Sequence, residues 1–112
     1  MNNIESIVIE YLANKLEVPV YKDVPKDRPN TFVTVENTGG FVDNSIETAN
    51  VAIQNWSDTE YNASELSILV AETLAQAPYF VSKILHVNNN LPYSYSDGSG
   101  HRYQFISEIK TI

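Results

Sequence analysis

The feature that most constrains the fold is the spacing of apolar residues, which switches along the chain between a helical and an alternating period. In residues 3–16 apolar side chains recur every three or four positions, at Ile4, Ile7, Val8, Tyr11 and Leu12. This spacing predicts an amphipathic helix with one buried face. Asn2 or Asn3 can cap the helix, and Glu5 lies in the first turn, where the helix dipole favours a carboxylate.

Alternating and β-branched residues predict three strands after this helix. Pro19, Pro25 and Pro29 argue against more helix, and residues 18–21 read as a short edge strand. Residues 31–36 predict a second strand, which residues 37–40 (Asn-Thr-Gly-Gly) are expected to end. A third strand is predicted at residues 49–56. The intervening residues 41–48 fit either a loop or the extension of a long hairpin.

A second helix follows this β-rich region. Ser57 with Glu60 three residues later fits a capping box, and Pro78 should stop the helix after about Ala77. The inward face is predicted to carry Leu66, Leu69, Val70, Leu74 and Ala77.

The last third of the chain predicts two strands, residues 81–87 and 103–109, joined by a long connection. The element order is therefore α-β-β-β-α-β-β. Because helices and strands do not alternate regularly, we expect an α+β fold in one domain, residues 1–112. The sheet should be antiparallel or mixed, with about four to five strands and both helices packed on it.

The charge balance argues against a nucleic-acid or membrane-binding role. The 14 acidic residues outnumber the 7 basic ones, giving a formal net charge of −7, and no Lys/Arg cluster is present. The absence of cysteine excludes disulfides and thiolate metal sites. The first residues lack the basic and apolar pattern of a secretory signal, so none is expected.

No residue pattern indicates catalysis, and we expect no enzyme. His86 and His101 are isolated and lack metal-ligand spacing, and residues 97–100 (Asp-Gly-Ser-Gly) read as a turn. No catalytic residue, cofactor, metal or small-molecule substrate is therefore predicted.

The connection at residues 88–100 is long for a hairpin and carries apolar residues where water is expected. Leu91, Tyr93 and Tyr95 fit two alternatives. They could anchor a protein interface, since aromatic side chains bury a large area with few rotors, or they could fold back as a lid over the sheet. Trp56 leaves a similar choice between core, sheet surface and interface.

Several short segments in order resemble phage tail-terminator (tail-completion) proteins. They are Val24-Pro25-Lys26-Asp27-Arg28-Pro29, Phe32-Val33-Thr34-Val35, Thr38-Gly39-Gly40, the strand ending at Trp56, the helix from Ala63 to Ala77, Asp97-Gly98, and Arg102-Tyr103-Gln104-Phe105. This resemblance spans nearly the whole chain and implies helices packed on a β-sheet.

The resemblance also implies a structural role without a reaction or cofactor. Proteins of this family assemble as hexameric rings that end tail-tube polymerisation and provide the surface for joining the head. The implied partners are copies of the same chain, the tail-tube protein and the head-closure protein. The implied location is the virion neck, after assembly in the host bacterial cytoplasm.

Residues expected at subunit or partner interfaces follow from the loops and from this resemblance. They are Pro25, Arg28, Pro29, Phe41, Trp56, Leu91, Tyr93, Tyr95 and Arg102. For Arg28 the alternatives are a bidentate contact with a neighbouring subunit and an internal ion pair that pins the proline loop. The acidic balance suggests carboxylates along a ring lumen, through which DNA passes without specific binding.

Two other functions stay open at this point. The nearest is another neck protein of the virion, such as a head-closure protein, for which we would expect a more barrel-like run of strands without a central helix. The second is a monomeric protein-binding module that uses the long connection or the proline segment.

Overall fold

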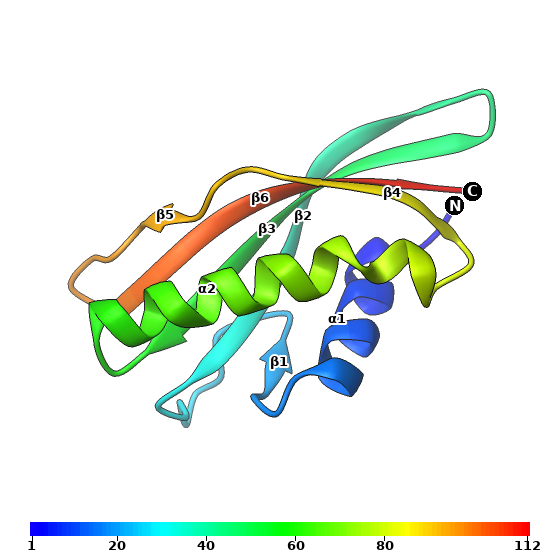
Figure 1. Cartoon of the computed structure of the whole chain (residues 1–112). Helices are drawn as coiled ribbons and strands as arrows, with labels where there is room; N and C mark the ends of the chain where they lie inside the picture. Colours follow the sequence, from blue (N-terminus) through cyan, green and yellow to red (C-terminus); the bar gives the residue numbers. More distant parts are fainter.

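The computed structural model describes residues 1–112 as a mixed six-stranded sheet with two α-helices (Figure 1). The elements are α1 (Ile4–Lys15), β1 (Val20–Tyr21), β2 (Phe32–Asp43), β3 (Ile46–Ser57), α2 (Glu60–Ala75), the 3-10 helix η1 (Ala77–Tyr79), β4 (Ile84–Asn89), β5 (Tyr93–Ser94) and β6 (His101–Thr111). The α+β class and the mixed sheet are as predicted. The strand count exceeds the prediction because the long connection contributes β5.

Both helices pack on one face of the sheet. The strand order is β1-β2-β3-β6-β4, with β5 beside β6; only the β1–β2 pair is parallel. A core of 15 buried residues joins α1 and α2 to alternate residues of the strands, among them Val33, Val35, Val51, Ile53 and Phe105. The residues between these point to the opposite side, called here the open face, which neither helix covers.

The first helix forms as its sequence predicts. The Asn3 side chain caps α1 by accepting a 3.2 Å hydrogen bond from the backbone N–H of Ser6. Its buried residues are Ile4, Val8, Tyr11 and Leu12, the predicted stripe apart from Ile7, which packs at the edge of the core.

The start and inward face of α2 differ from the prediction. Ser57 is not the cap, because it still pairs with His101 in the sheet; Thr59 caps instead, accepting from the N–H of Asn62 at 3.0 Å. Leu69 is 53% exposed, since the buried positions 66, 70 and 74 are spaced by four residues and position 69 lies outside their arc. The helix ends at Ala75, and Ala77 belongs to η1.

The predicted end of the second strand at residues 37–40 is wrong. A β-bulge between Asn37 and Gly39 absorbs one extra residue, and β2 continues to Asp43 in register with β3. Positive φ angles of 129° at Gly39 and 153° at Gly40 make this path possible. Of the two options for residues 41–48, the long hairpin is the one observed.

The last strands are also displaced from their predicted bounds. Ile84, not residue 81, begins β4, because Val81 and Ile84 close a turn through a 3.0 Å backbone hydrogen bond. Strand β6 extends the prediction by two residues at each end, since β3 pairs with it along its whole length.

Beyond the bulge, the β2–β3 hairpin runs on to a tip, residues 42–46, that extends past the last β3–β6 pair, Glu47–Thr111. We call residues 38–49 the arm; Figure 1 shows it projecting past the helices at the end where both termini lie. The molecule is accordingly elongated, 43 × 26 × 23 Å. None of its helices has the length and apolar character needed to cross a membrane.

Candidate interaction surfaces

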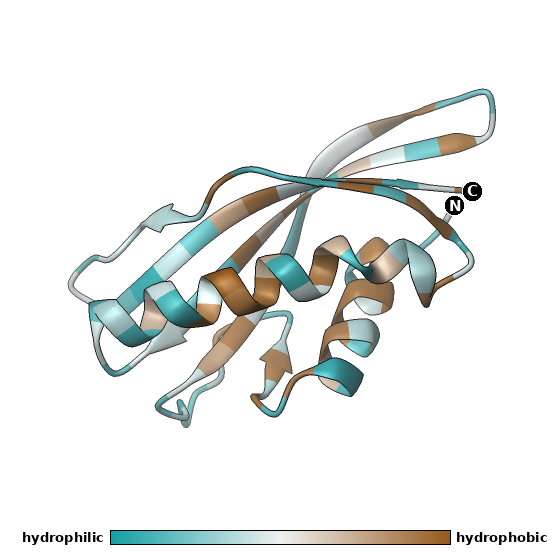
Figure 2. Ribbon diagram, in the orientation of Figure 1, coloured by the Kyte–Doolittle hydropathy of each residue, from teal (hydrophilic) through white to brown (hydrophobic).

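The arm carries apolar side chains that lie outside the hydrophobic core and stay partly exposed. Phe41 is 63% exposed, Val42 53% and Ile46 37%. Figure 2 shows these hydrophobic segments on both strands near the tip. A two-stranded ribbon is marginally stable in water, and clustered exposed apolar side chains are typical of binding surfaces. The arm is therefore the first candidate interaction surface.

The base of the arm is tied to the N-terminal segment. The Glu47 carboxylate accepts hydrogen bonds from the backbone N–H of Asn2 at 2.9 and 3.1 Å, and from its side-chain amide at 2.7 Å. The backbone N–H of Asn2 is the main cause that lowers the pKa of Glu47 below its ordinary value. A groove of about 230 Å³ lies beside this clamp, with Ile4, Phe41 and Val42 in its walls.

Where β2 begins and β3 ends, remote from the arm tip, lies an arginine–aromatic cluster of Arg28, Phe32, Trp56, Tyr95 and Arg102. The strand register aligns Phe32, Trp56 and Arg102 in one row across the open face. The rings of Phe32 and Trp56 stack with centroids 5.4 Å apart and planes tilted by 8°. The guanidinium carbons of Arg28 and Arg102 lie 4.6 and 4.7 Å from the Trp56 ring, within cation–π range.

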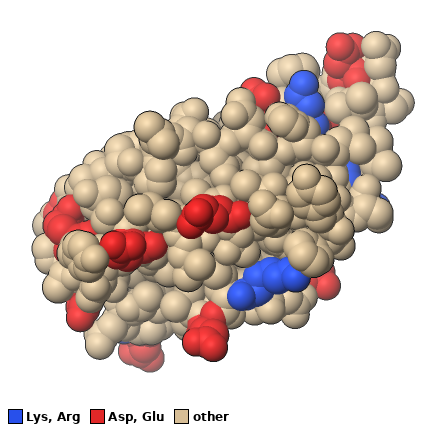
Figure 3. Space-filling view, viewed as in Figure 1, with Lys and Arg blue, Asp and Glu red and all other residues tan.

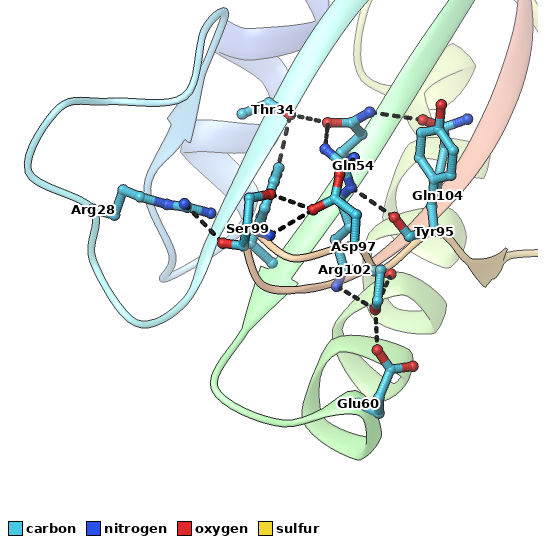
Figure 4. Close-up of polar contacts among 11 residues, drawn as sticks. Arg28, Thr34, Gln54, Glu60, Tyr95, Asp97, Ser99, Arg102 and Gln104 are labelled. Atoms are coloured by element: carbon cyan, nitrogen blue, oxygen red, sulfur yellow. Dashed lines mark hydrogen bonds and ion pairs between the residues drawn. The ribbon is translucent and has the colours of Figure 1, made fainter.

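Hydrogen bonds fix both arginines of the cluster (Figure 4). Arg28 donates to the carbonyl of Ser99 at 2.9 Å, which joins the proline loop to the turn before β6. Arg102 donates to the carbonyl of Tyr95 at 2.8 Å and forms a 2.7 Å ion pair with Asp97. The Ser99 hydroxyl and backbone N–H, and then the positive charge of Arg102, lower the pKa of Asp97.

A polar ladder occupies the next row of the open face. Gln54 donates to Gln104 at 2.8 Å (Figure 4), and Gln104 donates to the Tyr93 hydroxyl at 2.6 Å. Tyr93 thereby fastens the long connection to the sheet. Tyr93 itself stays 43% exposed, and Tyr95 is 47% exposed. Both tyrosines thus fold back against the chain, as the lid alternative predicts, and the interface alternative stays a prediction.

The structure brings some of the predicted interface residues together and separates others. Arg28, Trp56, Tyr95 and Arg102 meet in the cluster, with Tyr93 in the neighbouring row. Trp56 is only 3% exposed, so the option of a buried residue is the one observed. The others are placed as follows: half-buried Pro25 and Pro29 on the loop of Arg28, Leu91 at 88% exposure on the long connection, and Phe41 on the arm.

Sequence reasoning missed three members of these surfaces. Phe32 shares a row with Trp56, and the alternation of both strands could have indicated that pairing. Val42 and Ile46 lie in the segment that the sequence left between loop and hairpin, so no signal assigned them to a face.

The helix side of the molecule is acidic. Figure 3 shows Asp and Glu side chains along α2, which contains Glu60, Glu65 and Glu72 and no Lys or Arg. A hydrogen bond to Glu65 raises the pKa of Tyr61. His101 lies 3.3 Å from Glu60, but no group of three or more His, Cys, Asp or Glu side chains is arranged to hold a metal ion.

No protein-family model and no curated protein sequence matches the chain.

Proposed function

We propose that this protein is a structural subunit that assembles head to tail into a ring, and that the ring acts as a phage tail terminator. In this role the ring ends polymerisation of the tail tube and offers the surface to which the head is joined. Its partners are further copies of the chain, the tail-tube protein and the head-closure protein. It works in the neck of the virion after assembly in the bacterial cytoplasm.

The observation that carries the proposal is the arm. Its tip extends the sheet beyond the core, and it leaves Phe41, Val42 and Ile46 partly exposed. A hairpin of this kind gains stability when a second molecule buries its apolar side chains. A protein acting alone as a small-molecule binder has no physical need for such an extension.

The two dissimilar ends of the molecule favour a ring over a two-fold dimer. A ring of identical subunits uses heterologous contacts, in which each copy offers two different surfaces. The arm supplies one surface, and the body of the next copy supplies the other. A two-fold dimer would instead pair one surface with itself.

The open face carries two carboxylates that would line a DNA passage in the ring. Glu36 and Glu108 lie on it, each paired in register with residues of β3 that point to the same side, and the cations Lys110 and Arg102 share this face. Carboxylates repel the phosphates of DNA and would let it slide. Glu36→Lys with Glu108→Lys should slow DNA ejection from particles; ejection at the normal rate would remove the lumen assignment.

Two competing functions differ from the terminator in expected fold or in assembly. Helix α2, which follows β3 and precedes β4 in the chain, favours a terminator over a head-closure protein. For a head-closure protein we expect a more barrel-like run of strands without a central helix. A monomeric binding module would use the exposed connection around Leu91 and would stay a monomer at every concentration.

The deciding experiment combines native mass measurement, electron microscopy and phage complementation. The wild-type chain should form rings, alone or on tail tubes, and a Phe41→Ser/Val42→Ser variant should not. Ile68→Ser is the matched control, because Ile68 is an exposed apolar residue on α2, away from the arm; rings should persist. Normal-length tails joined to heads in particles that lack the protein would overturn the proposal.

A further inference from the structure

The sheet has two edges whose backbone groups are unpaired, and they lie on opposite sides of it. On one side, β1 covers only Val33 and Thr34 of β2. The N–H of Asn37 is taken by the Glu5 carboxylate at 2.7 Å, but the edge of the arm beyond the bulge is free. On the other side, β4 has β6 as its single neighbour. Free edges of this kind are templates for pairing with another chain.

The strand directions make these two edges compatible with one another. From β2 through β3 and β6 to β4, every neighbouring pair is antiparallel. The four strands therefore alternate in direction, and β2 and β4 run oppositely. A second copy placed laterally, with its β2 beside β4 of the first, continues the alternation without a break.

The backbone hydrogen bonds identify the residues whose backbone N–H and C=O groups point away from the sheet at each edge, called here outward-pointing residues. On β2, the N–H of Val33 points away from β3, to Pro19. The extra residue of the bulge reverses this alternation, so Gly40 and Val42 point outward on the arm. Next to β4, the N–H of Asn90 bonds to Ile106 of β6. Because backbone groups alternate along a strand, the even-numbered residues His86 and Asn88 also face β6, and Val87 points outward.

The register within one chain shows how two copies would match. One row of paired residues runs Gly40–Ala49–Ile109–Val87, and the next runs Phe41–Thr48–Lys110–His86. A copy added in the same rows sets Gly40 beside Val87, both pointing outward, and Phe41 beside His86 on the open face. Asp43 and Lys83, of opposite charge, then lie at the same end of the pair.

We propose that the arm edge of β2 pairs antiparallel with β4 of a neighbouring copy of this chain, in the register Gly40–Val87 and Phe41–His86. This inference rests on the proposed ring and names its subunit contact. The exposed side chains of the arm are covered by the neighbour, and the sheets of all copies join edge to edge. The contact is heterologous, as a ring requires.

Disulfide trapping tests the contact directly, because the chain contains no cysteine. In the proposed register Phe41 and His86 form a non-hydrogen-bonded pair, whose close Cα atoms suit a disulfide. The Phe41→Cys/His86→Cys variant should give, on oxidation, a ladder of linked chains up to the closed ring. Each single variant should stop at dimers, since it has one thiol per chain.

The register control is Phe41→Cys/Asn88→Cys, which moves one thiol by two residues along the same face. This variant should give less than one-tenth of the linked product. If rings form but neither double variant gives a ladder, the β2–β4 contact is wrong while the ring proposal stands. If the N88C pair alone links, the register is wrong. If no assembly forms and tails are unaffected by loss of the protein, the ring proposal itself fails.

A proline scan provides a second readout. Val42→Pro removes an outward N–H that has no partner within the chain, and proline is tolerated at such edge positions. We expect unchanged folding but association weakened up to tenfold relative to Val42→Ala, through loss of one intermolecular hydrogen bond per contact. Equal association of the two variants would contradict pairing through this edge.

Discussion

The two ends of the β2–β3 hairpin differ in the exposure of their aromatic and apolar side chains, which are buried at one end and exposed at the other. At the cluster end Phe32 is 2% and Trp56 3% exposed, and two arginines close over the rings. At the arm end Phe41 is 63% exposed, although it lies on the same strand as Phe32. Exposure is therefore set by what the rest of the chain brings to each end of the hairpin: loops cover the cluster end and leave the arm end exposed.

The largest expected effect tests whether the cluster is part of the chain's own core. Trp56→Ala should lower the free energy of unfolding by about 3–5 kcal/mol, because it leaves a cavity beneath Phe32 and both arginines. Phe41→Ala at the arm should change it by about 0.5 kcal/mol or less. Urea unfolding of dilute, dissociated protein measures both. Equal destabilisation by the two substitutions would show that Phe41 contributes as much as Trp56 to the stability of the isolated chain.

The next effect concerns the path of the arm. A Cβ on Gly40 would lie 1.9 Å from the Thr48 carbonyl oxygen, at a φ of 153°. Gly40→Ala should therefore lower the free energy of unfolding by about 1–3 kcal/mol and make the backbone of the arm less ordered. The control is Gly98→Ala, where nothing lies within 4 Å. Thermal unfolding and amide exchange of residues 41–48 are the measurements. An arm that stays equally protected in Gly40→Ala would show that the glycine is not required.

A smaller effect tests how the cluster is locked. Arg102 bonds to Asp97 and to the Tyr95 carbonyl, and it stacks between the rings of Trp56 and Tyr95. Arg102→Ala should cost about 2 kcal/mol, since charged hydrogen bonds and packing are lost together. Arg102→Lys keeps the charge but not the planar fork, and should recover less than half of the loss. Full recovery by lysine would mean that charge alone holds the connection.

The smallest effect is the response to acid. The Ser96 hydroxyl lowers the pKa of Glu60, and Ser99 lowers that of Asp97, from ordinary values of 4.5 and 3.8. A lowered pKa means that the unfolded chain binds protons first as the pH falls. Stability is therefore complete above these values and declines as the pH drops through them toward the folded-state pKa values.

Melting temperatures measured between pH 6 and 3 give this dependence. Asp97→Asn should flatten it, because the substituted residue no longer titrates. Glu47→Gln provides the matching variant at the arm, where the pKa of the carboxyl is also lowered. A steeper decline in Asp97→Asn than in the wild type would contradict the assigned sign.

The secondary structure followed from the sequence wherever a strong period was present. The stripe of α1 and a cap at Asn2 or Asn3 were predicted; the structure buries four residues of the stripe and places the cap at Asn3. The failures fall where local signals compete. Gly39 and Gly40 read as the end of a strand, but pairing with β3 across a bulge outweighed their low strand preference.

The cap of α2 failed for a related reason. Ser57 has the chemistry of a cap, yet it remains the last paired residue of β3, so the helix could begin only after it. Four of the five cluster residues were predicted one by one, but the cluster was not predicted as a unit. Arg28 and Arg102 lie far apart in sequence. The β3–β6 register places Arg102 beside Trp56, and the contact of the proline loop with the turn at residues 97–100 brings Arg28 to the same ring.

The sequence by itself determined the two α-helices, five of the six strands, most of their inward-facing residues and the acidic character, because periodicity, proline and charge act locally. Only the tertiary structure decided that residues 41–48 extend a hairpin into solvent, that Trp56 is enclosed, and that two unpaired edges remain on opposite sides of one sheet. These properties depend on which strands pair and in what register, and pairing energy comes from residues distant in the chain.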